Sequence, residues 1–462
     1  MQRKIKKRRI SKGTIFLNVI FSFVFVFLFF LFLFVPKVYL KGDYIVNINI
    51  NSIYRDNGVK SFKKIKTINE VDTSKIGSYE VKYIYRDNLF KYNFSRIVNV
   101  KDLEKPKIVL EGEDVEYYCP NGKYQEKGFK AYDNVDLDIT DKVKIKHEKD
   151  NITYEVEDSS GNRTKIIRKL REEDVEAPSI SLNGDDNVFI SLNESYNDTG
   201  VLVTDNCEGD LSSKVKVTNE VDTTKIGDYK VIYEVEDSSN NKSKIERNIK
   251  VREPLKANTI YLTFDDGPRD GTTDKILDIL KEKDVKATFF VTNNGSDLLI
   301  KRIVTEGHSI GIHTASHKYD IIYASVENYF NDLELVRKRI YDNTGVATKL
   351  IRFPGGSSNT ISKKYSEGIM STLTRETLDK GYQYYDWNID SGDSSFATNS
   401  HKLYNSVINS LSHDKYNVIL MHDTKTYTRD ALSKIIDYAK SEGYSFDVLD
   451  INKMPLRQKV NN

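Results

Sequence analysis

The feature that most constrains the fold is an internal repeat, because a segment copied within one chain is expected to fold alike at each copy. Residues 69–83 read NEVDTSKIGSYEVKY, and residues 219–233 read NEVDTTKIGDYKVIY. A middle copy shares YEVEDSSGN at 154–162 with YEVEDSSNN at 233–241, and Pro106 and Pro178 stand at equivalent junctions. The repeat therefore predicts three units of about 70 residues, which we place at 38–104, 105–176 and 177–253.

Each unit reads as all-β. Apolar and polar residues alternate at 229–237 and again at 242–251 with a polar turn between them, which predicts a hairpin with one buried face. The K-I-G-S/D-Y motif before these strands and DNCEGDLS at 205–212 resemble the bacterial immunoglobulin-like domains of Gram-positive surface proteins over residues 40–252. The resemblance implies sandwiches that act as a spacer or in wall association. Asp205 and Asp210 are interpreted as Asx-turn residues and not as calcium ligands.

An apolar run near the N-terminus predicts the topology. Residues 15–35 are apolar apart from Asn18 and Ser22, and a helix of this length extends about 30 Å, the thickness of the hydrocarbon layer. No small-residue cleavage pattern follows the run, and residues 1–13 before it hold seven Lys or Arg and no acid. We expect a cytoplasmic basic segment at 1–13, an uncleaved single-pass transmembrane anchor in the cell membrane at 14–36, and an extracellular remainder.

Charge and cysteine content limit the partners. Outside residues 1–13 the chain carries 63 basic against 68 acidic side chains, so nucleic acid is not expected as a partner. Hydrophobic residues make up 39%, with 29 Tyr and 21 Phe, which indicates a folded protein. Cys119 and Cys207 fall at different places in their repeats, and we expect two unpaired thiols. No protein partner is predicted.

From residue 257 the pattern changes to short apolar strands that alternate with amphipathic helices, which predicts an α/β domain at 257–455. We expect strands at 259–264 and 287–291, strand ends at 309–313, 349–353, 384–389 and 418–422, and helices at 273–283 and 326–342. Ionisable residues follow several of these strand ends, where an α/β barrel collects its active site.

Two motifs in this domain favour a metal site. Asp265 and Asp266 are adjacent carboxylates before Gly267-Pro268, and burying both would be costly without a cation. His313 and His317 are four residues apart and could direct two nitrogens at one point. With a carboxylate, for which we expect Asp266, they make a three-ligand set that leaves zinc one position for water.

Five motifs occur in order: TFDDGP at 263–268, HTASH at 313–317, RFPGG at 352–356, DSGD at 390–393 and LMH at 420–422. This series resembles the polysaccharide deacetylase family (NodB-like, carbohydrate esterase family four) over residues 257 to about 450. The resemblance implies the family's distorted (β/α) barrel. The expected fold class is therefore multidomain: a transmembrane helix, three all-β immunoglobulin-like sandwiches and a C-terminal α/β barrel.

The resemblance also implies roles for single residues. Asp265 is the expected general base and His422 the general acid, while Arg352 positions the base and Asp393 tunes the acid. The expected ligands of one divalent ion, Zn or alternatively Co or Mn, are Asp266, His313 and His317.

The sugar-facing positions depart from the family pattern. Ser394 follows Asp393 where the family usually has Trp, so Trp387, the only Trp of the chain, is proposed as a wall of the sugar site. Gly355 stands where the family often has Tyr, and its backbone N–H is expected to stabilise the oxyanion. Leu420 completes the expected substrate-binding set. His308, close to the second motif, is expected to be structural.

The predicted function is metal-dependent hydrolytic N-deacetylation of a cell-wall polysaccharide outside the membrane, most directly of N-acetylglucosamine in peptidoglycan. Two alternatives stay open: deacetylation of another polymer, such as poly-N-acetylglucosamine or acetylated xylan, or a non-catalytic wall-binding surface protein. The second alternative is disfavoured because the expected ligands, base and acid are all present.

Overall fold

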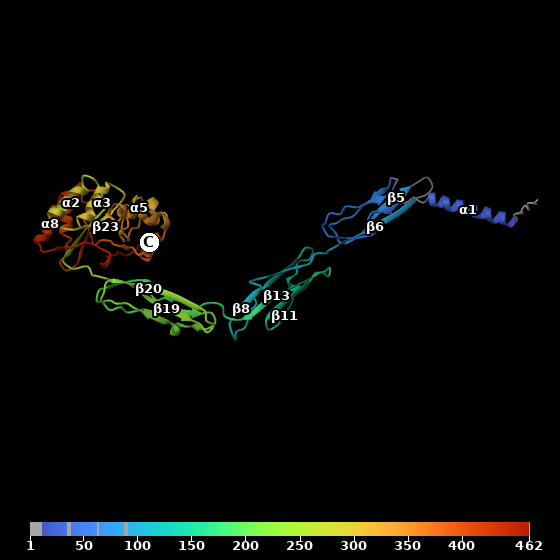
Figure 1. Ribbon diagram of the computed structural model, residues 1–462, viewed down its shortest axis with the longest axis horizontal. Coiled ribbons are helices and arrows are strands. Elements are labelled where there is room, and N and C mark those ends of the chain that lie inside the picture. Colours follow the sequence, from blue (N-terminus) through green and yellow to red (C-terminus); the bar gives the residue numbers. More distant parts are fainter. Residues whose placement is uncertain (1–11, 35–37, 62–63, 87–90, 462) are drawn as a thin grey trace, which may run out of the picture. The chain divides into compact units, whose positions relative to one another are not determined.

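The computed structural model describes residues 12–34, 38–61, 64–86 and 91–461 (Figure 1). The chain divides into two compact units, Met1–Val175 and Glu176–Asn462. The first unit holds repeats 1 and 2, and the second holds repeat 3 together with the α/β domain. The predicted boundary between repeats 2 and 3, at 176/177, lies one residue from this division, whereas repeat 3 and the α/β domain are one unit.

Helix α1 (Lys12–Phe34) occupies the apolar run near the N-terminus. Taken over the residues that the structure describes, no helix combines the length and the apolar character that crossing a membrane requires. The transmembrane anchor predicted at 14–36 is thus not supported by the structure, and the basic segment predicted at 1–13 lies almost entirely outside the described residues.

Each of the three repeats contains a four-stranded sheet with the same strand arrangement. Its strand order is β2-β6-β5-β4 in repeat 1, β8-β13-β12-β11 in repeat 2 and β15-β20-β19-β18 in repeat 3, and in each the first strand runs parallel to the last strand of its repeat. The bounds in this sheet are β2 (Ile45–Asn49), β4 (Lys66–Ile68), β5 (Gly77–Arg86), β6 (Lys91–Lys101), β8 (Val115–Tyr118), β11 (Lys144–His147), β12 (Asn151–Glu157), β13 (Arg163–Glu172), β15 (Asn187–Ser191), β18 (Lys216–Asn219), β19 (Gly227–Glu236) and β20 (Lys242–Arg252). The predicted hairpin is confirmed as β19–β20.

A smaller sheet completes each repeat. It pairs β1 (Tyr39–Leu40) with β3 (Val59–Lys60) in repeat 1, and it has the orders β10-β9-β7 and β14-β16-β17 in repeats 2 and 3. The bounds are β7 (Lys107–Leu110), β9 (Phe129–Asp133), β10 (Leu137–Asp138), β14 (Ser179–Leu182), β16 (Val201–Asp205) and β17 (Gly209–Asp210), with 3-10 turns at Thr140–Lys142 and Ser212–Lys214. The two-sheet arrangement agrees with the predicted sandwiches.

Each repeat also buries an arginine at the same place in its last long strand. Arg247 in β20 is fully buried, pairs with Asp198 and donates to the Tyr233 hydroxyl at 3.1 Å. Arg96 and Arg168 make the matching pairs with Asp56 and Glu126. A buried charge needs such a partner, and the sequence pattern alone did not reveal it.

The prediction about the cysteines is wrong. Neither Cys119 nor Cys207 is a free thiol, because both are disulfide-bonded. Their different positions within the repeats carried no information about sulfur geometry, which depends on distances in the folded chain.

Repeat 3 packs directly against the α/β domain within the second unit. Asn187 Nδ2 donates to Asp379 Oδ1 at 2.8 Å, and Arg252 Nε donates to Gln383 Oε1 at 3.3 Å. The guanidinium of Arg457 lies 4.0 Å from the centroid of the Phe189 ring. Repeat 3 is therefore a support for the α/β domain and not a freely hinged spacer.

The α/β domain is built on a parallel sheet in the order β25-β24-β23-β22-β21-β27-β26, with β28 beside β21. Its strands are β21 (Thr259–Asp265), β22 (Thr288–Val291), β23 (Ser309–Ile312), β24 (Leu350–Ile351), β25 (Gln383–Tyr384), β26 (Ile389–Asp390), β27 (Asn417–His422) and β28 (Ser445–Phe446). The predicted single strand end at 384–389 is wrong, because the segment contains β25 and β26 at opposite ends of the sheet.

The positions of β25 and β26 at opposite ends of the sheet show that the sheet is curved. Only residues 385–388 separate β25 from β26, and the chain from residue 384 to residue 389 can span at most about 18 Å. The two ends of the sheet must therefore curve toward each other, in agreement with the predicted distorted barrel.

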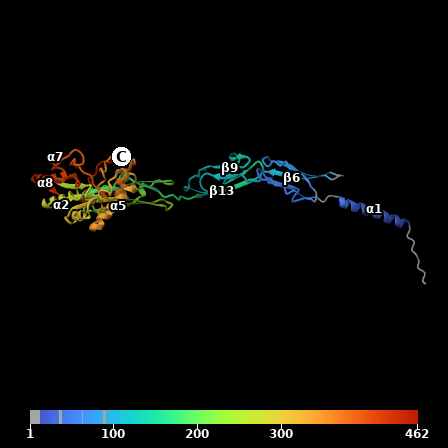
Figure 2. The ribbon, with the colours of Figure 1, turned by 90° about the horizontal axis from the view of Figure 1, so that it is seen from above.

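Helices cover this sheet, as both views show (Figures 1 and 2). They are α2 (Thr273–Glu282), α3 (Asp297–Thr305), α4 (Tyr319–Ile322), α5 (Val326–Thr344), α6 (Ile369–Asp379), α7 (Ser400–Ile408) and α8 (Thr426–Ser441), with a 3-10 turn at Ser362–Lys364. One buried apolar cluster joins their inner faces to the strands, from Ile260 in β21 to Ile436 in α8. This packed core fixes the carboxyl ends of the strands and the side chains that lie there.

Candidate active site

Adjacent carboxylates lie at the carboxyl end of β21. Asp265 is the last residue of the strand and only 2% exposed, while Asp266 follows in a left-handed conformation with φ 73°. This conformation is uncommon outside glycine. It turns the chain sharply, so that the two neighbouring carboxylates point to different parts of the site.

His313 and His317 reach the same end from the neighbouring β22–β23 side of the sheet. His313 comes directly after β23, and His317 sits in the loop that follows, with φ 51°. Asp332 of α5 holds this loop by accepting the backbone N–H groups of Ala315 at 2.6 Å and Ser316 at 3.0 Å. The two rings lie with centroids 5.1 Å apart.

Asp266, His313 and His317 form one cluster. Asp266 Oδ1 lies 3.5 Å from His313 Nε2 and 3.4 Å from His317 Nε2, and one ligand atom from each residue lies within 4.8 Å of the others. His313 Nδ1 is 2.8 Å from the carbonyl oxygen of Arg352. Because a carbonyl accepts, Nδ1 carries the proton and Nε2 presents its lone pair to the cluster.

The donor set fits a divalent cation. Asp266 Oδ1 is buried without a hydrogen-bond donor, and two imidazoles with one carboxylate are a common ligand set for zinc. Burial, the largest influence, lowers the pKa of His313, which favours the neutral ring that a metal needs. Burial raises the pKa of Asp266, but His313, His317 and His422 outweigh it and leave that pKa below its ordinary value.

Arg352 fixes the second carboxylate. This fully buried side chain follows β24 and donates to Asp265 Oδ1 at 3.0 Å and to the Thr263 hydroxyl at 2.6 Å. Its remaining donors reach the carbonyl oxygens of Tyr385 and Asp386 at 3.0 and 3.2 Å. Arg352 thereby orients Asp265, whose Oδ2 lies 3.8 Å from His313 Nε2.

His422, the last residue of β27, borders the cluster from another strand. Its Nε2 lies 3.9 Å from Asp266 Oδ2, and its Nδ1 lies 2.6 Å from Asp393 Oδ1. Asp393 Oδ2 accepts from the His422 backbone N–H and the Thr428 hydroxyl, each at 2.7 Å. Burial lowers the pKa of His422, but Asp393, with Asp265 and Asp266, outweighs burial and raises the pKa to about 9.

The residues predicted to bind substrate lie close to this centre. Gly355 has φ 78°, and a Cβ added there would lie 3.2 Å from the Tyr319 hydroxyl. The Trp387 ring centroid is 5.6 Å from the Arg352 guanidinium carbon, and a Cβ on Gly356 would lie 2.9 Å from that ring. Leu420 stands two residues before His422 in β27, on the same face of the strand.

Several supporting residues were missed from the sequence. Asp332 and Thr428 come from helices whose polar residues give no pattern that sets them apart, and Tyr319 places its ring 5.5 Å from that of His317. Asp423 is buried beside Gly267, and burial raises its pKa to about 7. Asp423 follows directly after the LMH motif, and this adjacency was the one sequence feature that could have indicated its place in the site.

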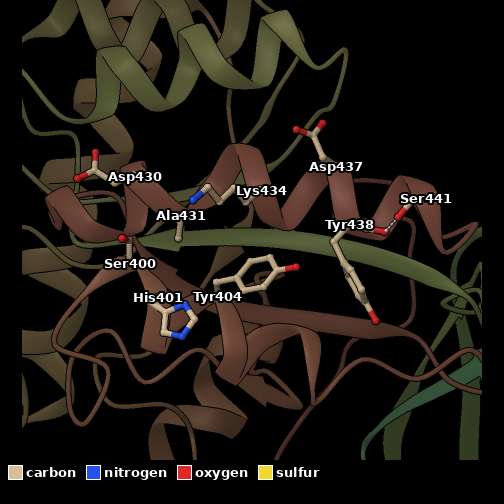
Figure 3. A pocket seen from close by; sticks show the side chains of 9 residues that line it. All are labelled: Ser400, His401, Tyr404, Asp430, Ala431, Lys434, Asp437, Tyr438 and Ser441. Atoms are coloured by element: carbon tan, nitrogen blue, oxygen red, sulfur yellow. Dashed lines mark hydrogen bonds between the residues drawn. The ribbon is translucent and has the colours of Figure 1, made fainter.

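His308 was expected to be structural, and its contacts agree. Its Nδ1 accepts the Ala287 N–H at 3.2 Å, and its ring meets Phe289 edge-on. His401 lies elsewhere, in a cavity of about 620 Å³ between α7 and α8 (Figure 3). That cavity includes none of the predicted site residues.

A buried carboxylate and a buried imidazole that both border one potential cation site are typical of metal-dependent hydrolases that use acid–base catalysis. Comparison with known proteins narrows this class. Residues 252–369 match the family model described as polysaccharide deacetylase, and residues 180–251 match that of a bacterial surface protein, Ig-like domain. The match contains the first three motifs of the α/β domain, while DSGD and LMH lie beyond it.

Individual relatives agree with the family match. The Bacillus subtilis protein YheN is 33% identical over 221 residues, which cover 46% of this chain and 74% of YheN. The peptidoglycan-N-acetylglucosamine deacetylase PgdA of Listeria monocytogenes is 32% identical over 46% of this chain and 43% of its own length. This chain belongs to the polysaccharide deacetylase family, and it carries a bacterial Ig-like domain before the catalytic domain.

Among solved structures, the catalytic domain of peptidoglycan N-acetylglucosamine deacetylase from Eubacterium rectale is 40% identical to this chain. The likeness covers 45% of this chain and 95% of that domain, with a TM-score of 0.44.

Proposed function

We propose that this enzyme removes the acetyl group from N-acetylated sugars of a cell-wall polysaccharide, with N-acetylglucosamine of peptidoglycan as its substrate. The observation that carries the proposal is the placement of Asp265 and His422 against the cluster of Asp266, His313 and His317. The choice of polymer is supported by the name of PgdA, a relative that covers the catalytic part of the chain.

Asp266, His313 and His317 would hold one divalent ion, with zinc favoured by the two imidazoles and cobalt or manganese as alternatives. When bound, such an ion supplies Lewis acidity for the acetyl carbonyl and lowers the pKa of water. The residues around the cluster then need only to transfer protons and to orient the reacting groups.

Asp265 acts as the general base in this proposal. Arg352 engages Oδ1, which leaves Oδ2 on the side of the cluster to take a proton from the attacking water. The four hydrogen bonds of the arginine fix its guanidinium, which prevents the carboxylate from rotating away.

His422 acts as the general acid. An amine leaves poorly unless it is protonated, so a proton must be ready at the nitrogen of the breaking bond. Asp393 holds Nδ1 of the ring, and the pKa of about 9 keeps the Nε2 proton in place at neutral pH. Nε2 is the ring nitrogen that faces the cluster.

The sugar-facing roles of Gly355, Trp387 and Leu420 belong to the same proposal. The backbone N–H at Gly355 would stabilise the oxyanion, and the ring of Trp387 would form a wall of the sugar site in place of the missing Trp at Ser394. The Tyr319 hydroxyl lies beside Gly355, so it offers a phenol near the position where the family often has one.

An extracellular location, with the N-terminus in the cytoplasm, stays a prediction from the basic and apolar segments at 1–36. Protease treatment of intact cells that express the chain would degrade the catalytic domain if the prediction is right. Protection of that domain in intact cells would contradict it.

The test of function measures acetate released from peptidoglycan by the full chain, with and without a chelator, for the wild type and Asp265→Asn. Both treatments should remove at least about 99% of the activity, and zinc should restore the chelated wild type. Asp270→Asn is the matched control, because this exposed aspartate lies in the same loop as Asp266 but outside the cluster, and it should leave the activity unchanged.

The outcomes separate the hypotheses. Acetate release that persists after both treatments would contradict the mechanism. Release from poly-N-acetylglucosamine or acetylated xylan, but not from peptidoglycan, would keep the mechanism and replace the substrate. No release from any of the three polymers would favour the non-catalytic wall-binding alternative.

A further inference from the structure

A second cluster of carboxylates lies far from the active-site motifs in sequence, where repeat 1 joins repeat 2. Asp102 follows β6, Asp133 ends β9 and Asp158 follows β12. A carboxylate oxygen from each lies within 4.8 Å of the others. The three residues are 4%, 9% and 5% exposed, so three carboxyl groups share one buried site.

Asx turns explain part of this arrangement. Asp133 Oδ2 accepts two backbone N–H groups, from residues 135 and 136, at 2.8 and 2.9 Å. Asp158 accepts the backbone and side-chain N–H groups of Asn162 and the backbone N–H of Ser160, each at 2.8 Å. Asp102 Oδ1 accepts the Glu104 N–H at 3.2 Å.

Two oxygens are left over. Asp102 Oδ2 and Asp133 Oδ1 are buried and have no hydrogen-bond donor. In the part of the chain that the structure describes, no Lys or Arg forms an ion pair with any of the three aspartates. Buried carboxylates of this kind are costly unless a cation neutralises them, so the cluster is incomplete with protein groups alone.

We infer that Asp102, Asp133 and Asp158 bind one calcium ion. The ligand atoms are all oxygens, which suit calcium or magnesium and not zinc. Calcium takes several carboxylate oxygens in a flexible geometry, whereas magnesium usually keeps several waters and binds through one or two carboxylates. Three carboxylates in one buried site therefore favour calcium.

Repeat 3 contains the same turn design. Asp205 ends β16 and Asp237 follows β19, the positions that correspond to Asp133 and Asp158. Asp205 Oδ1 accepts two backbone N–H groups at 2.8 Å, as predicted for an Asx turn, and its Oδ2 is again buried without a donor. A buried aspartate oxygen without a hydrogen-bond donor therefore occurs at the same position in both repeats and is not peculiar to one loop.

The ion would fasten the connection between repeats 1 and 2. Asp102 opens the segment 102–106, which leads from β6 to β7. Its carbonyl oxygen already accepts from Asn162 Nδ2 at 3.2 Å, and the Pro106 carbonyl accepts from the Thr164 hydroxyl. Calcium would add a third tie, from this segment to the end of β9, and stiffen the junction.

Equilibrium dialysis of the full chain, preloaded with one equivalent of zinc, tests the inference with calcium at about 0.01–10 mM, the range of calcium-binding modules outside cells. Asp133→Asn should bind one calcium ion fewer per chain than the wild type. Asp141→Asn, an exposed aspartate of the same repeat, should bind as many as the wild type. Asp102→Asn, which leaves both Asx turns of repeat 2 intact, should repeat the loss if Asp133→Asn does not fold.

Proteolysis provides a second readout. Calcium should slow cleavage within residues 102–106 at least about tenfold in the wild type, and it should have no effect in Asp102→Asn. Equal calcium stoichiometry in the wild type and the folded variants would overturn the inference. So would full occupation by magnesium at equal concentration, because the site would then not select calcium.

Discussion

The buried pair of Arg352 and Asp265 allows a quantitative test of the active-site architecture. Arg352→Met keeps the length of the side chain and removes its charge. Asp265, 2% exposed, would then be a buried carboxylate without its cation. Removing one partner of a buried ion pair costs about 3–5 kcal/mol, and the two carbonyls and the hydroxyl that lose their donor add to the cost.

Unfolding of the metal-free full chain, followed by tryptophan fluorescence, measures this cost. Trp387 is the only Trp of the chain, so the signal reports the α/β domain and not the repeats. For a domain of 150–250 residues, 1 kcal/mol shifts Tm by about 2–4 °C. Arg352→Met should therefore melt roughly 6–20 °C below the wild type.

A double-mutant cycle isolates the pair. Arg352→Met combined with Asp265→Asn removes both charges, and it should be more stable than the sum of the two single effects predicts, by about 1–3 kcal/mol. Arg337→Met, which breaks a surface pair with Glu334 on α5, should cost less than about 1 kcal/mol. An Arg352→Met variant within about 1 kcal/mol of the wild type would refute the reasoning.

Three further predictions follow from single contacts. Asp393→Asn should lower deacetylation of N-acetyl substrates roughly 10²-fold or more while sparing hydrolysis of 4-nitrophenyl acetate, since nitrophenolate leaves without a proton; equal losses would contradict the role of the acid. The pKa of His308 is lowered by burial to about 4, below its unfolded value, so the folded state binds fewer protons and stability falls as pH drops from 6.5 toward 4. Urea unfolding at pH 7 and 4.5 should show a loss of about 2–3 kcal/mol that His308→Asn, which can still accept the Ala287 N–H, reduces; an unchanged loss in the variant would count against this cause. Gly311→Ala would place a Cβ 2.6 Å from the Phe290 ring and should destabilise the domain by about 1–3 kcal/mol in the same assay, and a neutral result would mean that the sheet can relax there.

Much of the candidate site was predictable because its residues stand in short motifs. Asp265 and Asp266 are adjacent in the sequence, and His313 and His317 are four residues apart. Each pair needs only one local turn to present its side chains. The predicted Asx turn at Asp205 is confirmed for the same reason, since its hydrogen bonds span two or three residues.

The supporting contacts were not predictable in this way. Asp332 reaches the histidine loop from α5, and Thr428 reaches Asp393 from α8. The acidic partners of the buried Arg96, Arg168 and Arg247 lie more than 30 residues away in sequence. Such pairings depend on how elements pack, which no local spacing encodes.

The sequence by itself determined the repeats, the change from β to α/β at residue 257 and the resemblance of the five motifs to the polysaccharide deacetylase family. These features follow from local alternation, composition and motif order. Only the tertiary structure decided that β25 and β26 lie at opposite ends of the sheet, that both cysteines are oxidised and that three distant aspartates share one buried place. The physical reason is that pairing energies depend on distance in space, and the fold sets those distances between residues that the chain keeps far apart.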